Sequence, residues 1–501
     1  MAENPTADAT ANADADQLAK LGYTSQFNRE MNLWENFALG FTYLSPVVGI
    51  YSLFAIALAA GGPPMIWWLL IVGLGQLMVA LVFSEVVSQY PIAGGVYPWA
   101  RRLWGRKWAW MTGWVYGWAL LATIASVTYG AGPFVAALFG IESSQNVTII
   151  IALILIAVVT LVNLQGTRVL GRVAFFGFVA EIVGALVVGG WLLIAHREQD
   201  WGVIFDDFGL VDDAGSYVPA FIAAALIGLY QYYGFEACGD VAEEVPNPGL
   251  RIPKAMRMTI YIGGAAAMFI CFALILAVVD IGAVISGEDV DPIGTILAAS
   301  FGDVGSKLVL VVVLISFFSC ALSLQAAAGR MIYSYGRDRM IFGSEVLSRM
   351  SPGKHMPPAA LGLAAIVPAF LVLIDKLIEG GLVKIVSFAA LGIYIAFQMV
   401  VLAALRARIK GWKPGGQYTL GGWGMIVNVV ALAYGLFAMW LLVRPYGVEE
   451  WSFFDNWIVG ISAGLVILLG LAYMVVARPH EKGDAVAGDA VSAGEVPAGK
   501  A

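Results

Sequence analysis

The sequence predicts an all-α membrane protein with twelve transmembrane helices, built as two inverted repeats of five helices followed by two extra helices. Three observations predict this fold: the apolar composition, twelve apolar stretches of about bilayer length, and an interruption in the first and sixth of them. Sixty per cent of the 501 residues are apolar, 13 per cent are charged, and the mean hydropathy is +0.81. These values lie far outside the range of soluble domains, so the bilayer is the solvent that the chain must satisfy.

Most of the twelve apolar stretches are long enough to cross a hydrocarbon core roughly 30 Å thick. They cover residues 33–60, 65–89, 107–135, 147–165, 173–195, 217–243, 255–281, 305–333, 359–375, 382–405, 421–443 and 454–477. If both termini are cytoplasmic, five of the 28 Lys and Arg residues fall on the outer side, namely Arg197, Lys307, Lys376, Lys384 and Arg444. The positive-inside rule therefore predicts an even number of crossings, with both termini in the cytoplasm and the chain in the cytoplasmic membrane.

The first and sixth stretches each contain residues that break helices. The first contains Ser45-Pro46 and then Gly49, and the sixth contains Gly234. Unpaired backbone amides and carbonyls are costly in lipid, so unwound backbone is tolerated only inside protein or along a wet cavity. Two such interruptions at matching places of two halves indicate the substrate site of a transporter.

The interruptions divide the chain into repeats. The predicted organisation is a disordered cytoplasmic N-terminal tail (1–30), a first repeat (31–200), a second repeat (201–410), two extra helices (411–479) and a disordered cytoplasmic C-terminal tail (480–501). Because each repeat has an odd number of crossings, the second starts from the opposite face of the membrane. The tails are rich in small and polar residues and lack an apolar core, which favours disorder.

Three loop motifs resemble those of a known family. They are Ser84-Glu85 with Tyr90-Pro91-Ile92-Ala93-Gly94-Gly95-Val96-Tyr97, then Gly234-Phe235-Glu236 with Glu243-Glu244-Val245-Pro246-Asn247-Pro248, and finally Arg330-Met331-Ile332-Tyr333-Ser334-Tyr335-Gly336-Arg337-Asp338-Arg339. In this order they resemble the amino acid–polyamine–organocation permeases, and the last two motifs are similar to the amino acid/choline branch. The resemblance implies a leucine-transporter-like fold with discontinuous helices 1 and 6, and transport by alternating access.

The resemblance also implies a substrate site at the two interruptions. Backbone groups of Ser45, Val48 and Gly49 would contact a substrate carboxylate, because the N-terminal amides of a helix form an anion site. Pro46 and Val48 crowd a stretch where the family usually has spaced glycines, which leaves room for a substrate other than an α-amino acid. The remaining candidates are Tyr232, Tyr233, Gly234, Phe235 and Glu236.

The aromatic residues and the carboxylate at the second interruption each have two interpretations. The aromatic rings either pack or form a lid with cation–π contact to an ammonium group, and Phe235 has the position of the family's lid. Glu236 either caps the second half-helix or binds an amino group.

Glu181 is the one ionisable residue near the middle of the fifth stretch. Such a group is costly in the bilayer and should face a cavity or a partner. By the resemblance it falls where sodium-independent relatives place a lysine. Three interpretations stay open: a protonatable coupling group, a sodium ligand together with Ser316 and Ser319, or a protonated structural residue. The two serines can equally serve close helix packing.

A further set of charges lies near the predicted cytoplasmic ends of the helices. The set comprises Glu85, Arg101, Glu243, Glu244 and Arg330. These side chains either form solvated surface charge or an ion-pair gate that breaks to release substrate.

These features favour a secondary transporter of amino acids or related small amines, coupled to protons and working by rocking of the first, second, sixth and seventh spans. The alternative is a sodium-coupled symporter or an exchanger for GABA, choline or polyamine. His196, His355 and His480 all lie outside the spans, so neither a metal cluster nor a nucleophile–histidine pair can form there, and we expect no enzyme, metal or cofactor. The expected partners are the substrate, a proton rather than sodium, and the lipid bilayer; no nucleic-acid partner is expected.

Overall fold

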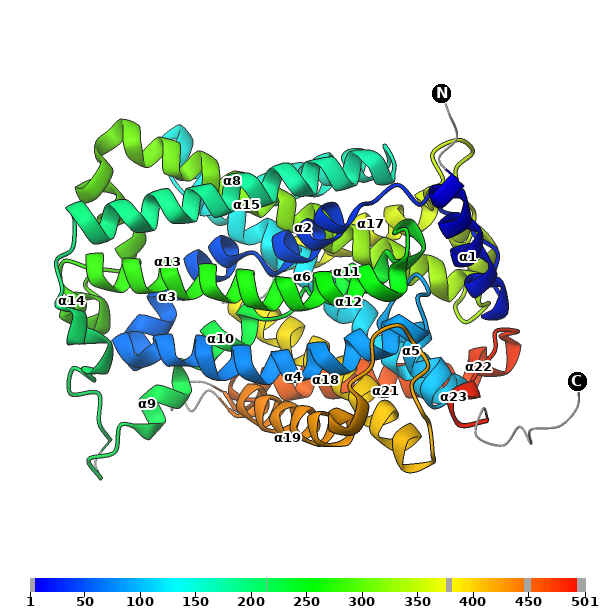
Figure 1. The fold of residues 1–501 in the computed structure, drawn as a ribbon. Helices are drawn as coiled ribbons and strands as arrows, with labels where there is room; N and C mark the ends of the chain where they lie inside the picture. Colours follow the sequence, from blue (N-terminus) through cyan, green and yellow to red (C-terminus); the bar gives the residue numbers. More distant parts are fainter. Residues whose placement is uncertain (1–4, 213, 375–380, 446–451, 493–501) are drawn as a thin grey trace, which may run out of the picture.

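The computed structural model describes residues 5–212, 214–374, 381–445 and 452–492. Within these ranges every regular element is helical, which confirms the all-α prediction. The long helices run side by side in one bundle, and both ends of the chain lie at the same end of that bundle (Figure 1).

Ten helices in the described ranges are long and apolar enough to cross a membrane. They are α2–α3 (Leu33–Gly61), η1–α4 (Pro63–Gln89), α6 (Arg106–Phe139), α7 (Gln145–Asn163), α8 (Thr167–Ala195), α12–α13 with an intervening π-helical turn (Pro248–Ala277), α15 (Pro292–Arg337), α18 (Gly381–Ile409), η6–α19 (Gly421–Val443) and α21 (Ile458–Ala477). Two shorter apolar helical segments, α9–α10 (Val218–Gln231) and α17 (Pro358–Ile374), occupy the places of the predicted sixth and ninth crossings. The number twelve stays a prediction.

The first crossing is interrupted where the sequence predicts. Helix α2 (Leu33–Leu44) starts at a capping box, in which the Asn32 and Glu35 side chains each accept a hydrogen bond from the backbone amide of the other residue. It ends because Ser45, at φ 39° and ψ 92°, leaves the helical region. Helix α3 (Pro46–Gly61) then begins with Pro46, whose missing N–H is harmless in a first helical turn.

The second interruption is longer than the first. Helices α9 (Val218–Ala223) and α10 (Leu226–Gln231) precede it, and the four-residue α11 (Ala237–Asp240) and η3 (Ala242–Glu244) follow. Gly234 has φ 116°, a conformation that a residue with a side chain adopts only under strain. The stretch read as one broken helix over 217–243 is therefore four short pieces.

The packing around the interruptions fixes which helices can supply side chains to them. Helix α8 packs against α2, α13 and α15, and α6 packs against α15 and α18. The break in the first crossing thus faces α8, and both α6 and α8 pack against α15.

The two tails differ from the predicted disorder. Residues 5–20 form helix α1 (Pro5–Lys20), and the C-terminal tail contains α22 (Pro479–Lys482) and α23 (Asp489–Ser492). The reason is polar contact with the bundle: Asp14 accepts a hydrogen bond from the Asn247 amide at 2.8 Å, and Asp489 pairs with Arg102 at 2.8 Å. In Figure 1, α1, α22 and α23 all lie at one end of the bundle.

Candidate functional site

The two helix breaks lie directly against each other. A side-chain carbon at Gly234 would stand 2.6 Å from the Leu44 amide nitrogen, so only a glycine permits this approach. Gln231, fully buried at the end of α10, donates from Nε2 to the Leu44 carbonyl at 3.2 Å. A side-chain carbon at Gly49 would meet the other end of this amide, Gln231 Oε1, at 2.1 Å. Gln231 therefore bridges the end of α2 and the start of α3.

Glu181 of α8 lies at the start of α3 and is fully buried. Its Oε1 accepts hydrogen bonds from Ser45 Oγ at 2.7 Å and from the Val47 amide at 2.9 Å. A carboxylate in this position is stabilised by the free amides and the dipole of a helix N-terminus. The side chain singled out in the fifth span thus contacts the break in the first.

The other amides of the first turn of α3 are also bonded within the chain. The Val48 amide donates to Ser45 Oγ at 3.2 Å, and the Gly49 amide donates to the Ser45 carbonyl at 3.1 Å. Pro46 has no amide hydrogen. The groups of Ser45, Val48 and Gly49 expected to contact a substrate carboxylate are therefore satisfied by Glu181 and by Ser45 itself.

The second break is lined by two further carboxyl groups, Glu236 and Asp240, both fully buried. Glu236 Oε2 accepts from the Gly234 amide at 2.7 Å and makes no side-chain cap on α11, so it orders the break rather than capping the helix. The Tyr116 hydroxyl of α6 lies 3.3 Å from Glu236 Oε1 and 3.0 Å from Asp240 Oδ2. Tyr116 thus joins the two acids.

The three aromatic residues at the second break point in different directions. Tyr233 packs edge-on against Tyr43 of α2, with ring centroids 6.2 Å apart. Phe235 packs instead between Phe83 of α4 and Phe397 of α18, at 5.9 and 5.4 Å. Tyr233 is therefore the aromatic ring that faces the first break.

Tyr232 packs away from both breaks. A side-chain carbon at Gly73 of α4 or at Gly264 of α13 would come within 2.9 Å of its ring. Its ring therefore fills the space that these two glycines leave between α4 and α13, which is a packing role.

The serines of α15 bond to their own helix. Ser316 Oγ donates to the Val312 carbonyl at 3.0 Å, and Ser319 Oγ donates to the Ile315 carbonyl at 2.9 Å. In the part of the chain that the structure describes, neither serine is a hydrogen-bond partner of Glu181, and no cluster of three or more His, Cys, Asp or Glu residues could hold a metal ion. The geometry of these serines matches helix packing.

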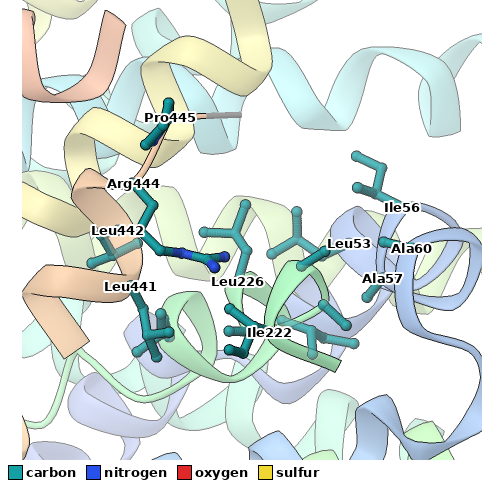
Figure 2. Close-up of a pocket in the computed structure, with 15 residues that line it drawn as sticks. Leu53, Ile56, Ala57, Ala60, Ile222, Leu226, Leu441, Leu442, Arg444 and Pro445 are labelled. Carbon is teal, nitrogen blue, oxygen red and sulfur yellow. The ribbon is translucent and has the colours of Figure 1, made fainter. Parts of the chain in front are cut away.

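A crevice of about 270 Å³ opens beside α3, the second half of the first broken crossing, and beside α9–α10, which precede the second break (Figure 2). It is bounded by α3, by α9–α10 and by the end of α19, and its lining is mostly Leu, Ile and Ala. Among the described residues that line it, Arg444 is the charged one, and Figure 2 shows the guanidinium pointing toward Leu226.

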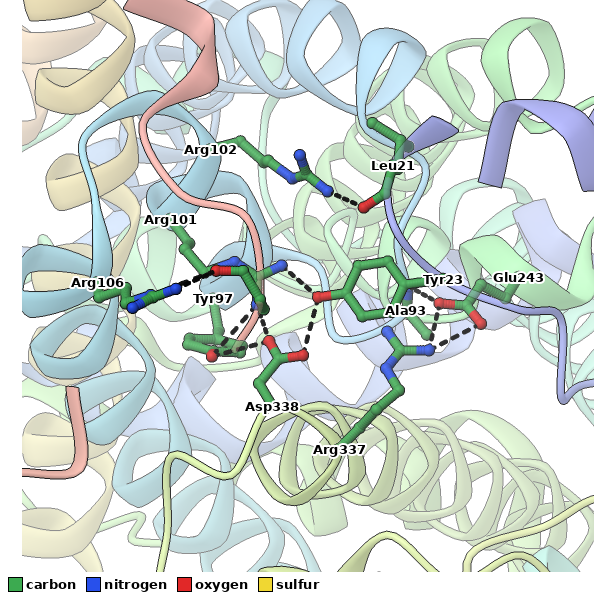
Figure 3. A network of polar contacts seen from close by, with 11 residues as sticks. Leu21, Tyr23, Ala93, Tyr97, Arg101, Arg102, Arg106, Glu243, Arg337 and Asp338 are labelled. Carbon is green, nitrogen blue, oxygen red and sulfur yellow. Dashed lines mark hydrogen bonds and ion pairs between the residues drawn. The ribbon is translucent and has the colours of Figure 1, made fainter. Parts of the chain in front are cut away.

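At the end of the bundle that carries both termini, five side chains form a connected ion network, which Figure 3 shows together with neighbouring residues. The ion network comprises Tyr23, Arg101, Glu243, Arg337 and Asp338. Arg330 holds Glu244 with two hydrogen bonds of 2.8 and 3.1 Å, and both side chains are fully buried. Arg337 pairs with Glu243 at 2.8 Å. Of the five predicted gate residues, Arg101 and Glu243 thus lie in the ion network, and Glu244 and Arg330 form a separate buried pair.

Tyr23 ties the N-terminal segment into the ion network. Its hydroxyl donates to Asp338 at 2.8 Å and accepts from Arg101, which also pairs with Asp338. The Arg337 guanidinium lies 4.1 Å from the centre of the Tyr23 ring. The fifth predicted gate residue, Glu85, lies elsewhere and pairs with Arg408 of α18.

Replacing Arg330 with alanine is expected to lower the free energy of unfolding by about 3–5 kcal/mol, because the Glu244 carboxylate would stay buried without its partner. Thermal unfolding of the purified protein in detergent measures the change. The matched control is Arg339→Ala, which removes an exposed pair with Asp484 and should change stability by no more than about 0.5 kcal/mol. Equal losses in the two variants would show that the Arg330–Glu244 pair contributes no more than a surface pair.

The bundle of apolar helices with two facing breaks defines the class of protein as a membrane transporter. The profile of the amino acid permease family matches residues 31–463, so the chain belongs to this family. A putative amino acid/polyamine transporter of Macrophomina phaseolina is 27% identical over 80% of this chain and 91% of its own length. The amino-acid permease BAT1 of Arabidopsis thaliana is 25% identical over 93% of this chain and 94% of its own length.

A solved structure shows the same fold. A mutant of the manganese transporter of Eremococcus coleocola superposes with a TM-score of 0.60 over 90% of this chain and 94% of that one, at 13% identity. The likeness supports a transporter fold of the leucine-transporter type, and at this identity it carries no information on substrate.

Proposed function

We propose that this permease is a proton-coupled secondary transporter of amino acids or related small amines, with twelve crossings in a five-plus-five inverted arrangement. The observation that carries the proposal is the direct contact between the two helix breaks, at Leu44 and Gly234. Unwound backbone is tolerated only inside protein or along a wet cavity, and paired interruptions in two halves of a chain are typical of a transporter's substrate site. Both breaks are buried, so the solute must reach them by rearrangement of the helices, which is alternating access.

Glu181 is proposed as the proton-coupling group. As a carboxylate it ties α8 to the start of α3 through Ser45 and Val47. Protonation removes the charge that the N-terminus of α3 stabilises, and this weakens the tie between the two helices. Proton binding would thus permit the first crossing to move relative to α8.

The ion network is proposed as the gate at the end that carries the termini. Together with the separate Arg330–Glu244 pair, it joins α15 to η3 through Arg337–Glu243, and it joins α15 to the helix α5 (Val96–Leu103) through Arg101–Asp338. Because these contacts hold α15 against η3 and α5, they must open for solute to pass at this end.

Sodium coupling is the second candidate, through Glu181 with Ser316 and Ser319. Hard cations need several converging oxygen ligands, and in the described part of the chain Glu181 bonds to Ser45 and Val47 rather than to either serine. The proton is therefore the ion that the local geometry favours.

Reconstitution into liposomes tests the coupling. With an inside-alkaline pH gradient and no sodium, we expect the labelled substrate to accumulate, and a protonophore should abolish the accumulation. A sodium gradient without a pH gradient should drive none. Accumulation driven by sodium alone would contradict proton coupling, and exchange without net uptake would identify an exchanger.

A further inference from the structure

We infer that the site between the two helix breaks takes an organic cation with at least one ammonium group, and that a carboxylate on the substrate is not needed and weakens binding. The inference deepens the proposed function and rests on it for the location of the site. It follows from which hydrogen-bonding groups of the breaks are taken and which are left.

The anion position of the site is filled by the chain itself. Each amide hydrogen in the first four residues of α3, Pro46 to Gly49, already has an acceptor, and one of these acceptors is the Glu181 carboxylate. A helix N-terminus binds an anion through such amides. A substrate carboxylate would therefore have to displace Glu181 from Val47 and would then lie beside it.

Among the groups left over, the carboxylate and amide oxygens are acceptors, and the unpartnered hydroxyls of Tyr43 and Tyr233 can donate or accept. Glu181 Oε2 and Gln231 Oε1 are buried oxygen atoms without a hydrogen-bond partner among the described residues, and Asp240 Oδ1, also unpartnered, faces Gly95, where a side-chain carbon would stand 2.4 Å from it. Gln231 Oε1 is directed at the start of α3, since a side-chain carbon at Gly49 would meet it at 2.1 Å. A buried acceptor left unpaired is unfavourable, and an ammonium group offers three N–H donors and no acceptor.

The charge of the site has the same sign. Glu181, Glu236 and Asp240 are all fully buried, and within the described ranges none of them belongs to an ion pair. The nearby Arg330 donates two hydrogen bonds to carboxylate oxygens, and both go to Glu244. Arg330 is therefore already paired with another acid. An acidic group in a bilayer-embedded site is neutralised either by a proton or by a countercharge, and a cationic solute supplies the countercharge.

An aromatic wall completes the match. Tyr43 and Tyr233 lie edge to face at 6.2 Å, and Tyr230 packs against Tyr233 at 5.4 Å. Tyrosine faces attract ammonium groups by cation–π interaction. Acceptors, charge and aromatic faces thus all favour the same ligand chemistry.

Amino acids and their decarboxylation products form the probe pairs, because the two members of each pair differ only by the carboxylate. Ornithine with putrescine, lysine with cadaverine, and tyrosine with tyramine are tested by thermal shift and by competition on the purified full-length protein. We expect at least one amine to raise the apparent melting temperature and to bind about tenfold or more tighter than its parent amino acid. Tighter binding of the parents in every pair, or binding by no member of any pair, would overturn the inference.

Two variants test whether Glu181 causes the preference for amines over amino acids. Glu181→Ala frees the Val47 amide and removes one negative charge, so the ratio of amine to amino acid affinity should fall about tenfold or more. Ser316→Ala alters a neighbouring packing hydroxyl and should leave the ratio within about twofold. An unchanged ratio in Glu181→Ala would overturn the role of this carboxylate in selection.

Arg444 in the crevice is the competing carboxylate-binding group. If the parent amino acids bind better and Arg444→Ala abolishes that preference, the substrate carboxylate is recognised there and the inference fails. The proposed transport and the inference are contradicted by different results. Amine binding without uptake in liposomes would contradict the proposed transport. Uptake of amino acids in preference to amines would contradict only the inference.

Discussion

Glu181→Gln is expected to abolish pH-gradient-driven accumulation of substrate while counterflow exchange continues. The amide has nearly the shape of the carboxyl group and can still accept hydrogen bonds from Ser45 and Val47, which in the native chain lie at 2.7 and 2.9 Å. It cannot take up and release a proton in the physiological range, so the proton gradient has no group through which to act. Net accumulation should fall to the level of empty liposomes, and the exchange rate should stay within about tenfold of the native rate.

The sign of the pH dependence provides the check on this variant. In the native protein, lowering the outside pH at constant inside pH should increase uptake, because a carboxylate accepts its proton from the side to which the site opens. The variant should show a flat profile. A variant that keeps the native pH dependence would remove Glu181 from the coupling step, and a variant that loses exchange as well would place it in substrate binding alone.

Gly234→Ala is expected to abolish transport and to destabilise the protein. Gly234 has φ 116°, which costs a residue with a side chain about 1–3 kcal/mol, and the new methyl carbon would stand 2.6 Å from the Leu44 amide nitrogen. The two breaks would be forced apart at their point of contact. Uptake in liposomes and the melting temperature in detergent measure the two effects.

Gly190→Ala is the matched control. It lies in α8, has no positive φ, and nothing lies within 4 Å of the position of the added methyl carbon. It should transport at a rate within about twofold of the native rate and unfold within about 0.5 kcal/mol of it. Normal uptake by Gly234→Ala would show that close contact of the breaks is not required for transport.

The sequence allowed the helix breaks to be predicted because their causes are local. Pro46 restricts the preceding residue, and Gly234 permits a backbone that few other residues adopt. Glu181 could be singled out for a similar reason, because an isolated carboxyl group in an apolar span is unusual whatever surrounds it. Its contact with Ser45 and Val47 is tertiary, and no pattern within its own span indicates it.

Other parts of the site were beyond sequence reasoning. Tyr23 lies in a segment whose composition favours disorder, and its contacts with Arg101, Arg337 and Asp338 help to order it. Gln231 gave a signal that could have been used, since it is an amide inside an apolar stretch next to the second break.

The backbone conformation at the second break decides which aromatic side chain can act as a lid over the first break. The irregular backbone at Gly234 turns Phe235 toward Phe83 and Tyr233 toward Tyr43. Helical periodicity does not describe such a segment, so the sequence could not decide which ring faces the first break. For the same reason it could not foresee that Glu236 bonds back to the Gly234 amide.

A cryo-electron microscopy structure of the purified protein with saturating cadaverine is the most direct test of the claim that solute binds where the two interrupted crossings meet. We predict ligand density between Ser45 and Gly234, with an ammonium group within hydrogen-bonding distance of Glu181 and Gln231. Density confined to the crevice beside Arg444, or two uninterrupted helices at these positions, would contradict it.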